Sequence, residues 1–286
     1  MKKHLLGGIP GEVDYNLLVE SDEFREMEIF SSRFLTKNQS ILERYAKKWV
    51  GDPLHQWSRQ WEYPFVFSRL ESSLVTTAKP RVLDAGSGVT FFPYYVKQKI
   101  KSAEVHCCDS DESLAAIYQA INDGAKNGVK FSRADMRKAP YQDDWFDVVY
   151  CISVLEHTNN YEEIIDDFHR ILRPGGKFIV TFDISLDGTR DISPARAVKL
   201  LHALNKKFDN DDGSGSGLTT DISNTGIFTT MSAKKIDANL LPWKYPAILY
   251  RVKAMMTGKK LGHWPPLLSV YCLSMTKSRA QAIAEF

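Results

Sequence analysis

The stretch Arg81-Val82-Leu83-Asp84-Ala85-Gly86-Ser87-Gly88 carries the strongest structural signal in this chain. A short apolar run ends in an acidic residue and a glycine-rich turn, as in a strand that stops where a nucleotide-like ligand begins. Because Gly86 and Gly88 have no Cβ, the backbone can turn tightly there and bring its N–H groups against a ligand. Such a turn is weak evidence alone, so its interpretation depends on the motifs that come after it in the chain.

Further apolar runs succeed the turn, and each ends in polar residues. The second run ends in Asp109, 23 residues after Gly86. That spacing is near the ~20 residues at which a carboxylate meets ribose hydroxyls in a βαβ unit. Asp135, after the third run, is placed to accept a hydrogen bond from an adenine amino group. Strands that alternate with helices predict an α/β fold with a parallel sheet and right-handed crossovers.

This ordered set, over roughly residues 80 to 185, resembles the class I S-adenosylmethionine-dependent methyltransferases. The resemblance implies a Rossmann-like doubly wound sheet, mostly parallel, with an antiparallel last strand at residues 269–276. It implies S-adenosylmethionine (SAM) as the cofactor, with the glycine turn along its methionine and ribose and the acid of the second strand on its ribose hydroxyls. The expected cofactor-binding residues are Asp84, Ala85, Gly86, Ser87, Gly88, Thr90, Asp109, Ser110, Asp135, Met136, Ser153 and Tyr63.

One position departs from the family pattern, which often has a third glycine where this chain has Thr90. Its hydroxyl either bonds the methionine carboxylate or caps the following helix. A nicotinamide-binding turn fits less well, because the sixth place from Gly86 is Phe91 and not glycine. A carboxylate at Asp84 would also repel a pyrophosphate, whereas it suits a sulfonium.

The composition is that of an enzyme without strong charge bias. The 286 residues carry a net charge of +2, with a sequence pI of about 8.2. No apolar run approaches the ~20 residues that span a membrane, and the run after Lys2 and Lys3 is too short for a signal peptide. The four cysteines lack metal-ligand spacing. We expect reduced structural thiols, no metal site and a cytoplasmic location.

The chain divides into four zones. Residues 1–79 are expected to form a helical N-terminal cap, 80–185 the SAM-binding core, 186–268 a substrate-side insertion, and 269–286 the final strand and tail. Apolar periodicity predicts helices at residues 22–34, 40–50, 161–172 and 193–208. The glycine- and serine-rich residues 209–217 are either a lid or a plain surface connection.

Two aromatic segments stand outside the core motifs. Trp57, Trp61 and Tyr63 either line the ligand site or pack in the interior. Arg59 could pair with the cofactor carboxylate, although an exposed arginine is the simpler expectation. Residues 240–256 interleave apolar and basic side chains, so they either lie on a membrane surface or pack their apolar side onto the core. We favour the second interpretation.

Methyl transfer to a hydroxyl needs a base, and His157 is the first candidate because it follows the fourth strand and imidazole titrates near neutrality. Glu156 could orient it, and Asp183 after the fifth strand could act as a base or substrate anchor. Each also has a structural interpretation: Glu156 and His157 could shape the turn, and Asp183 could bond the backbone.

The acceptor class is narrowed by what is missing. Ser153-Val154-Leu155-Glu156 stands where base-modifying methyltransferases carry Asn/Asp-Pro-Pro-Tyr/Phe, and there is no dense basic stripe. We therefore expect no nucleic acid and no integral membrane partner, but a small-molecule acceptor of secondary metabolism, methylated on oxygen and less favourably on nitrogen. Two alternatives stay open: aminopropyl transfer, which Asp183, Asp187 and Asp191 could support, and a non-catalytic cofactor-binding subunit. The sequence leaves the oligomeric state open.

Overall fold

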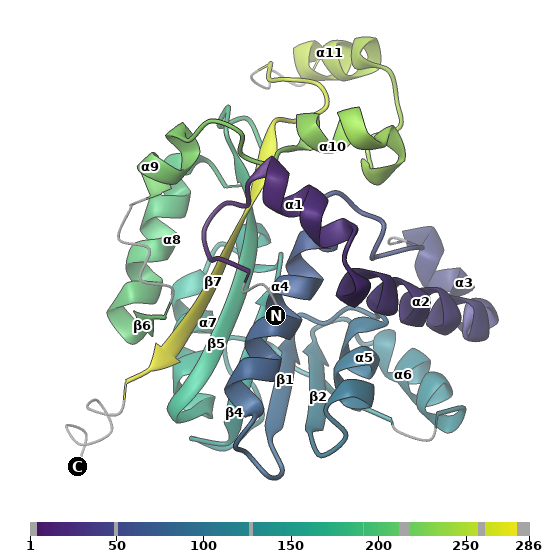
Figure 1. The fold of residues 1–286 in the computed structure, drawn as a ribbon, viewed down its shortest axis with the longest axis vertical. Coiled ribbons are helices and arrows are strands. Elements are labelled where there is room, and N and C mark those ends of the chain that lie inside the picture. The colour runs from purple at the N-terminus through teal and green to yellow at the C-terminus, as the bar shows by residue number, and fades with distance from the viewer. Residues whose placement is uncertain are drawn as a thin grey trace.

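A seven-stranded sheet forms the centre of the computed structural model, which describes residues 5–48, 51–125, 128–190, 192–211, 218–256 and 261–278 (Figure 1). The strand order is β3-β2-β1-β4-β5-β7-β6. The strands are β1 (Arg81–Ala85), β2 (Glu104–Asp109), β3 (Lys130–Arg133), β4 (Phe146–Ile152), β5 (Leu172–Ser185), β6 (Phe208–Asn210) and β7 (Leu268–Lys277).

Strands β1 to β5 are parallel, and β7 runs antiparallel to β5. The predicted mostly parallel sheet with an antiparallel last strand is confirmed. The three-residue β6, antiparallel to β7, was not predicted because it is too short to give a period. The Pro174-Gly175-Gly176 turn lies inside the beginning of β5, where the register against β4 shifts.

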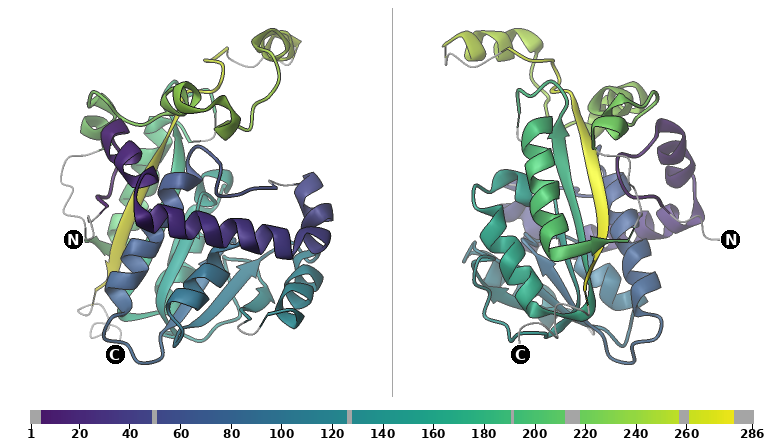
Figure 2. Two further views of the ribbon diagram at one scale, coloured as in Figure 1. Left: turned by 45° about the vertical axis from the view of Figure 1, so that its right-hand side comes forward. Right: turned by 90° about the vertical axis from the view of Figure 1, so that its left-hand side faces the viewer.

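Helices cover both faces of the sheet, because successive strand residues point to opposite sides. Val82, Cys107 and Val148 pack toward one hydrophobic cluster, and their neighbours Leu83, Cys108 and Val149 toward the other. The first face carries α4 (Arg59–Leu74), α5 (Phe92–Lys99) and α6 (Leu114–Asp123); the second carries α7 (Tyr161–Ile171), α8 (Pro194–Lys207) and α9 (Leu218–Ser223) (Figure 2). Both faces are therefore buried, as parallel sheets require.

The N-terminal zone is helical, with α1 (Glu12–Val19), α2 (Asp22–Lys37) and α3 (Gln39–Lys48). Helix α1 packs on α4, α2 on α5 and α3 on α6 (Figure 1). Ser21 caps α2 by accepting the Phe24 N–H at 3.1 Å, and the apolar stripe of α2 is buried. The predicted helices at residues 22–34, 40–50, 161–172 and 193–208 are present, each within a few residues. Helix α4 was not predicted, because Pro64 stands inside it.

The first described residues close one edge of the sheet. Gly8 and Cys272 of β7 exchange two backbone hydrogen bonds, of 2.7 and 3.0 Å. The Glu12 N–H then donates to the Gly226 carbonyl at 2.8 Å. The N-terminal segment is thus hydrogen-bonded both to β7 and to Gly226, which precedes β7 in the sequence.

The zone between β5 and β7 carries α8, β6, α9, α10 (Thr230–Ile236), the 3₁₀ turn η2 (Ala238–Leu240) and α11 (Ala247–Met256). Residues 212–217 of the glycine- and serine-rich loop lie outside the described residues. The expectation that residues 240–256 pack their apolar side onto the core is wrong for α11, because Met255 and Met256 are 75% and 83% exposed. In the described ranges no helix is both long and apolar enough to cross a bilayer. All four cysteines are buried and free.

Candidate cofactor and acceptor site

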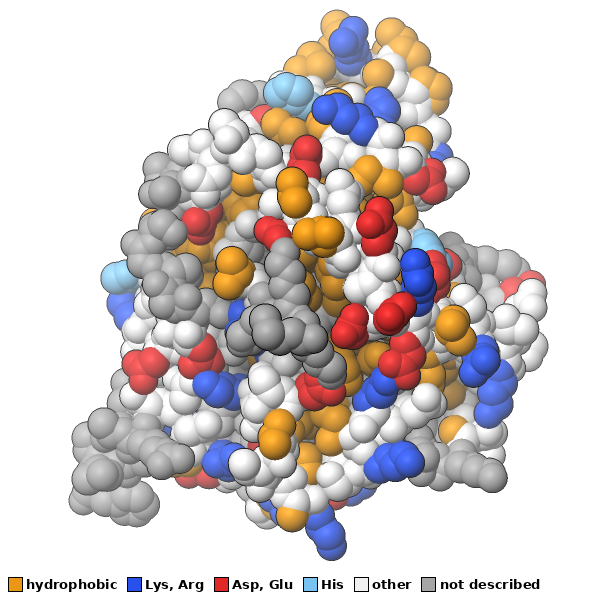
Figure 3. All heavy atoms as spheres, in the orientation of Figure 1, with side chains coloured by type: hydrophobic (Ala, Val, Ile, Leu, Met, Phe, Trp, Pro, Cys, Tyr) orange, Lys and Arg blue, Asp and Glu red, His pale blue; other side chains and the backbone are white. Residues whose placement is uncertain are grey.

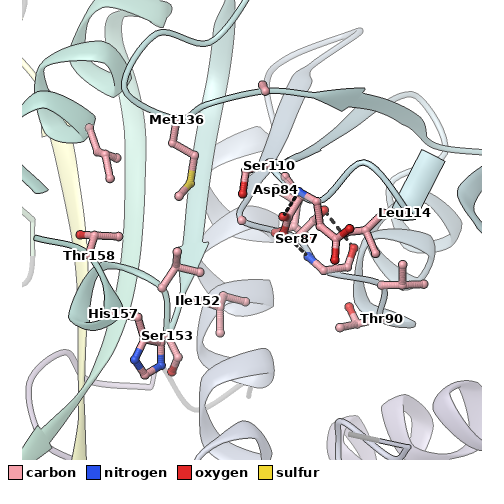
Figure 4. Close-up of a pocket in the computed structure, with 18 of the residues that line it drawn as sticks. Asp84, Ser87, Thr90, Ser110, Leu114, Met136, Ile152, Ser153, His157 and Thr158 are labelled. Carbon is pink, nitrogen blue, oxygen red and sulfur yellow. Dashed lines mark hydrogen bonds between the residues drawn. The ribbon is translucent and has the colours of Figure 1, made fainter. Parts of the chain in front are cut away.

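A cavity of about 850 Å³ opens at the carboxyl edge of the parallel strands, where ligands of open α/β sheets bind (Figure 4). Its size lies in the ~300–1,000 Å³ range of small-molecule sites. Ser87, Ser110 and Leu114 line one end, and Ser153 and His157 line another. The cap closes it with Tyr45 of α3, Arg59 and Tyr63 of α4, and Pro53 and Gln56 between these helices.

The glycine turn after β1 adopts a conformation that few other residues could take. Gly86 and Gly88 have φ values of 71° and 50°. A Cβ on Gly86 would lie 2.7 Å from a Val154 methyl carbon, and one on Gly88 would lie 2.6 Å from the Tyr45 hydroxyl. The Tyr45 hydroxyl also accepts the Val89 N–H at 2.9 Å. The N-terminal cap therefore sits directly on the turn, and both glycines are required by close approach as well as by φ.

Asp109, at the end of β2, is held in place by the backbone. Its Oδ2 accepts the Gly88 N–H and its Oδ1 accepts the Asp111 N–H, both at 3.0 Å. Each carboxylate oxygen keeps a second lone pair for a ligand. A direct hydrogen bond therefore connects the acid at the end of β2 to the glycine turn.

Asp84 is a buried carboxyl, 5% exposed, on the cavity wall. Burial, with a smaller contribution from the Asp109 charge, raises the pKa of Asp84 to about 8, although a hydrogen bond with Tyr150 and the Arg59 charge lower it. A buried acid with so little positive charge around it would be stabilised in its ionised form by a cationic ligand.

A buried polar network links the cap to the ends of β4 and β5. Arg59 Nη1 donates to Ser153 Oγ at 2.6 Å, and Ser153 Oγ donates to Glu62 Oε1 at 2.7 Å. Arg59 and the Thr181 hydroxyl also donate to the Glu62 carboxylate. Glu62 is completely buried, whereas the Arg59 side chain is 23% exposed and reaches the cavity. The simpler expectation of an exposed Arg59 is therefore wrong.

The three candidate catalytic residues lie at different depths. His157 is exposed and lines the cavity. Glu156 is buried, and its Oε1 accepts the Asp183 N–H at 3.2 Å. Burial, with the Glu62 charge adding to it, raises the pKa of Glu156 to about 8. Among the described residues that line the cavity, neither Glu156 nor Asp183 is present, so only His157 reaches it directly.

Other predicted cofactor residues also line the cavity, including Thr90, Ser110, Asp135, Met136 and Tyr63. Asp135 is exposed and paired with Arg137, whose guanidinium lowers the pKa of Asp135 to about 2. Thr90 lines the cavity, and its hydroxyl accepts the Phe92 N–H at the start of α5, at 3.3 Å. Ala85 is buried in β1 and is not among the residues that line the cavity.

The aminopropyl-transfer alternative rested on Asp183, Asp187 and Asp191, and neither Asp183 nor Asp187 is among the residues that line the cavity. Asp187 accepts the His263 and Thr189 N–H groups at 2.9 and 3.1 Å, which hold its pKa below its usual range. Asp191 lies outside the described residues. Within the described ranges, no group of three or more His, Cys, Asp or Glu side chains is arranged to hold a metal ion.

Residues 83–180 match the family model of the methyltransferase domain. The core of this chain is a class I SAM-dependent methyltransferase domain. Its matched segment runs from the middle of β1 to the middle of β5, and it includes Asp84, Gly86, Gly88 and Asp109.

Curated methyltransferases resemble parts of this chain. The sterol 4-C-methyltransferase strm-1 of Caenorhabditis elegans is 36% identical over 83 residues, 29% of this chain and 25% of that protein. The methyltransferase GfsG of Streptomyces halstedii is 30% identical over 127 residues, 43% of this chain and 44% of that protein. The chain thus spans less than half the length of these curated relatives.

A solved structure extends the likeness of fold beyond the methyltransferase domain. The structure of the cyclase SpnF matches 96% of this chain and 99% of its own, with a TM-score of 0.50 and 16% identity. At that identity the likeness concerns the fold alone, and one fold carries many activities.

The cofactor of this methyltransferase domain is SAM, and the site fits it on two structural observations. The buried Asp84 carboxyl has a raised pKa that a sulfonium or ammonium charge would lower. Gly86 and Gly88 both line the cavity, so the turn brings backbone without a Cβ against the bound ligand. Asp109 adds the acceptor that two vicinal hydroxyls require.

Sequence reasoning missed two residues around the methyltransferase domain. Tyr45 gave no signal, because its partner is a backbone N–H 44 positions away. Glu62 follows Arg59 by three positions, the spacing of an ion pair within a helix, and a correct helix assignment would have suggested it. Trp57 and Trp61, by contrast, are 3% and 2% exposed and belong to the core, whereas Tyr63 lines the cavity.

Proposed function

We propose that this chain transfers the methyl group of SAM to an oxygen of a small-molecule acceptor, with nitrogen as the less favoured target. The observation that carries the proposal is one continuous cavity, whose wall includes Asp84, Gly88 and Asp109 as well as the imidazole of His157. A ligand bound to the glycine turn would share that space with an acceptor near His157. Such a shared space is what an in-line displacement requires.

The cofactor side is assigned to the residues that the backbone holds rigid. Asp109 is fixed by the Gly88 and Asp111 N–H groups and would accept hydrogen bonds from the ribose hydroxyls. Asp84 would face the positive charges of the ligand, and the Arg59 guanidinium would meet its carboxylate. When bound, SAM supplies an electrophilic methyl group on a sulfonium centre.

On the acceptor side, His157 is proposed as the base. The imidazole is exposed to the cavity, where it can accept the proton of an acceptor hydroxyl. Glu156 and Asp183 are assigned positioning roles, because the Glu156 carboxyl bonds the backbone of Asp183 at the carboxyl end of β5. We assign the exclusion of water and the alignment of the acceptor to three cap residues that line the cavity, Tyr63, Gln56 and Pro53.

The test begins with calorimetric titration of the full chain with SAM and S-adenosylhomocysteine. We expect binding by the wild type and its loss in Asp109→Ala, while Asp123→Ala, an exposed acid at the end of α6, binds normally. Thermal unfolding of each variant checks that it is folded. Absence of binding by folded wild-type protein would refute the proposed function.

Mass spectrometry of reactions with hydroxylated and amine metabolites then tests for turnover. A product 14 mass units heavier than its acceptor, formed only with SAM, supports methyl transfer. Tight cofactor binding with no product on any acceptor class would favour the non-catalytic alternative.

A further inference from the structure

The segment from η2 to the beginning of β7 differs in charge from the rest of the chain. Overall the sequence is nearly balanced, with 37 Lys and Arg against 35 Asp and Glu. Between residues 238 and 264, however, the sequence contains no Asp or Glu at all, while α11 and the turn before it carry Lys244, Arg251 and Lys253. The same segment holds Trp243, Tyr245, Tyr250 and Trp264. Basic residues and amphipathic aromatic rings are together enriched where proteins meet a bilayer surface.

Helix α11 turns an apolar stripe away from the protein. Ile248, Leu249, Val252, Met255 and Met256 are 62%, 57%, 46%, 75% and 83% exposed. At about 100° per residue these five positions fall within an arc of roughly 120°. Arg251 and Lys253 fall at the two edges of that arc, about 40° beyond its ends. An apolar face bordered by cations is the pattern of a helix that lies in the plane of a membrane interface.

The stripe is exposed although the other side of the helix is anchored. Tyr250 and Ala254, on the inner side, are 8% and 4% exposed. The Tyr250 ring stacks on Trp264 with 4.8 Å between ring centroids, and its hydroxyl accepts the Gly262 N–H at 3.0 Å. Arg190, after β5, lies over the same ring at 5.3 Å. These contacts fix the orientation of α11 with Tyr250 inward, and the apolar stripe on the opposite side of the helix therefore faces outward.

The position of the helix relates it to the site. The chain leaves α11 to enter β7 at Leu268, which pairs with Ser185 at the carboxyl end of β5. That is the edge of the sheet at which the cavity opens. Figure 1 shows α11 projecting beyond this edge, and Figure 2 shows it standing clear of the body in both further views. In Figure 3 orange apolar side chains and blue basic ones gather at this tip.

We propose that α11 docks on the surface of a lipid bilayer that contains anionic lipids. The apolar stripe enters the boundary between head groups and acyl chains, and the basic residues at its edges meet the anionic head groups. The carboxyl edge of the sheet then faces the bilayer, within reach of acceptors that partition into it.

Charge distinguishes this partner from the other candidates. Two copies packed stripe to stripe would bring Lys244 and Arg251 of each copy together, and residues 238–264 of neither copy contain an acid to offset these charges, so the contact would be repulsive. A nucleic acid would meet the cations but would leave five exposed apolar side chains without a partner. An anionic bilayer satisfies both the charge and the apolar stripe.

Vesicle flotation with the full chain tests this proposal without cofactor or acceptor, so its failure is distinct from failure of the proposed function. We expect binding to vesicles of phosphatidylcholine with one part in three of phosphatidylserine to exceed binding to pure phosphatidylcholine at least tenfold. Arg251→Gln should weaken it by roughly fivefold, the share of one basic residue at such a surface, and added salt should weaken it further.

The double variant Ile248→Ser/Met255→Ser should lose at least tenfold in binding while keeping the unfolding temperature of the wild type. The matched control is Val13→Ser/Val75→Ser, which removes two apolar side chains, 71% and 78% exposed, that lie outside α11. It should bind like the wild type. Equal binding of both double variants, or no binding to anionic vesicles, would overturn the proposal. A stable dimer that dissociates in the Ile248→Ser/Met255→Ser variant but not in the control would also overturn the proposal, because a second copy would then cover the stripe.

Discussion

Glu62 is a buried charge whose removal should destabilise the fold strongly. Its completely buried carboxylate accepts hydrogen bonds from Arg59 of α4, from Ser153 directly after β4 and from Thr181 of β5. Removing one partner of a buried ion pair costs about 3–5 kcal/mol, because the other charge is left uncompensated. The Arg59 side chain is 23% exposed, so water recovers part of its loss. Two neutral hydroxyls lose an acceptor as well, at about 1–3 kcal/mol each if left unsatisfied.

We therefore expect Glu62→Ala to lower the free energy of unfolding by about 3–5 kcal/mol, since such losses overlap and do not add. At about 2–4 °C per kcal/mol, the unfolding temperature should fall by roughly 6–20 °C. The measurement is urea unfolding followed by circular dichroism. Glu71→Ala, the same change at a half-buried position of the same helix, should cost less than about 1 kcal/mol.

The double variant Arg59→Met/Glu62→Met separates the ion pair from simple packing. If the cost of Glu62→Ala arises from the stranded guanidinium, removing both charges should restore much of the lost stability. A Glu62→Ala protein as stable as Glu71→Ala would refute the reasoning. A double variant less stable than either single change would show that the charges are net stabilising and not merely paired.

Three further changes test the site. His157→Ala should lower turnover by ~10²–10⁴ with cofactor affinity nearly unchanged, as steady-state kinetics and calorimetry would show, whereas equal turnover would remove it as the base. Gly88→Ala should destabilise the turn and abolish cofactor binding, because its φ is 50° and the new Cβ would lie 2.6 Å from the Tyr45 hydroxyl; normal calorimetric binding would contradict this. The pKa of Asp84 is raised to about 8 in the folded protein, against ~3.9 in the unfolded chain. Between these two pH values the folded state holds a proton on Asp84 that the unfolded state has lost. The free energy of unfolding therefore falls as the pH rises toward 8. Asp84→Asn should therefore be more stable than the wild type at pH 8.5 and lose stability less steeply from pH 6, with the raised pKa of Glu156 accounting for the remaining slope; an unchanged slope in urea titrations would show that Asp84 is not the titrating group.

The sheet and the gathering of the glycine turn and Asp109 around one cavity could be predicted from the sequence because their signals are local. Gly86 and Gly88 stand in one turn, and the offset to Asp109 is set by the length of one βα unit. Both periodicity and turn chemistry act over a few residues, so a single sequence reveals them. The assignment of β7 as antiparallel came from the family resemblance and not from the pattern itself.

The acceptor half depends on contacts between distant segments. Glu62 and Thr181 are 119 positions apart, and no spacing rule connects them. Pro64 concealed α4, although the surrounding core holds that helix together. The orientation of α11 was also unpredictable, because its anchors Arg190 and Trp264 lie well away in sequence on either side of it. Which face of an amphipathic helix is buried depends on what packs against it.

The pairing of Gly8 with Cys272 has a practical meaning for the handling of this protein. The short β6 covers β7 only from Met275 to Lys277, so the N-terminal segment is what occupies the free side of β7 near Cys272. Unpaired strand edges recruit other chains and seed aggregation. A fragment trimmed to the family core, or a fusion that pulls the first ten residues out of place, would leave that side of β7 open. Tags are better placed after the last strand, and loss of colloidal solubility on N-terminal trimming would reflect edge-to-edge association and not a failure of the cofactor site.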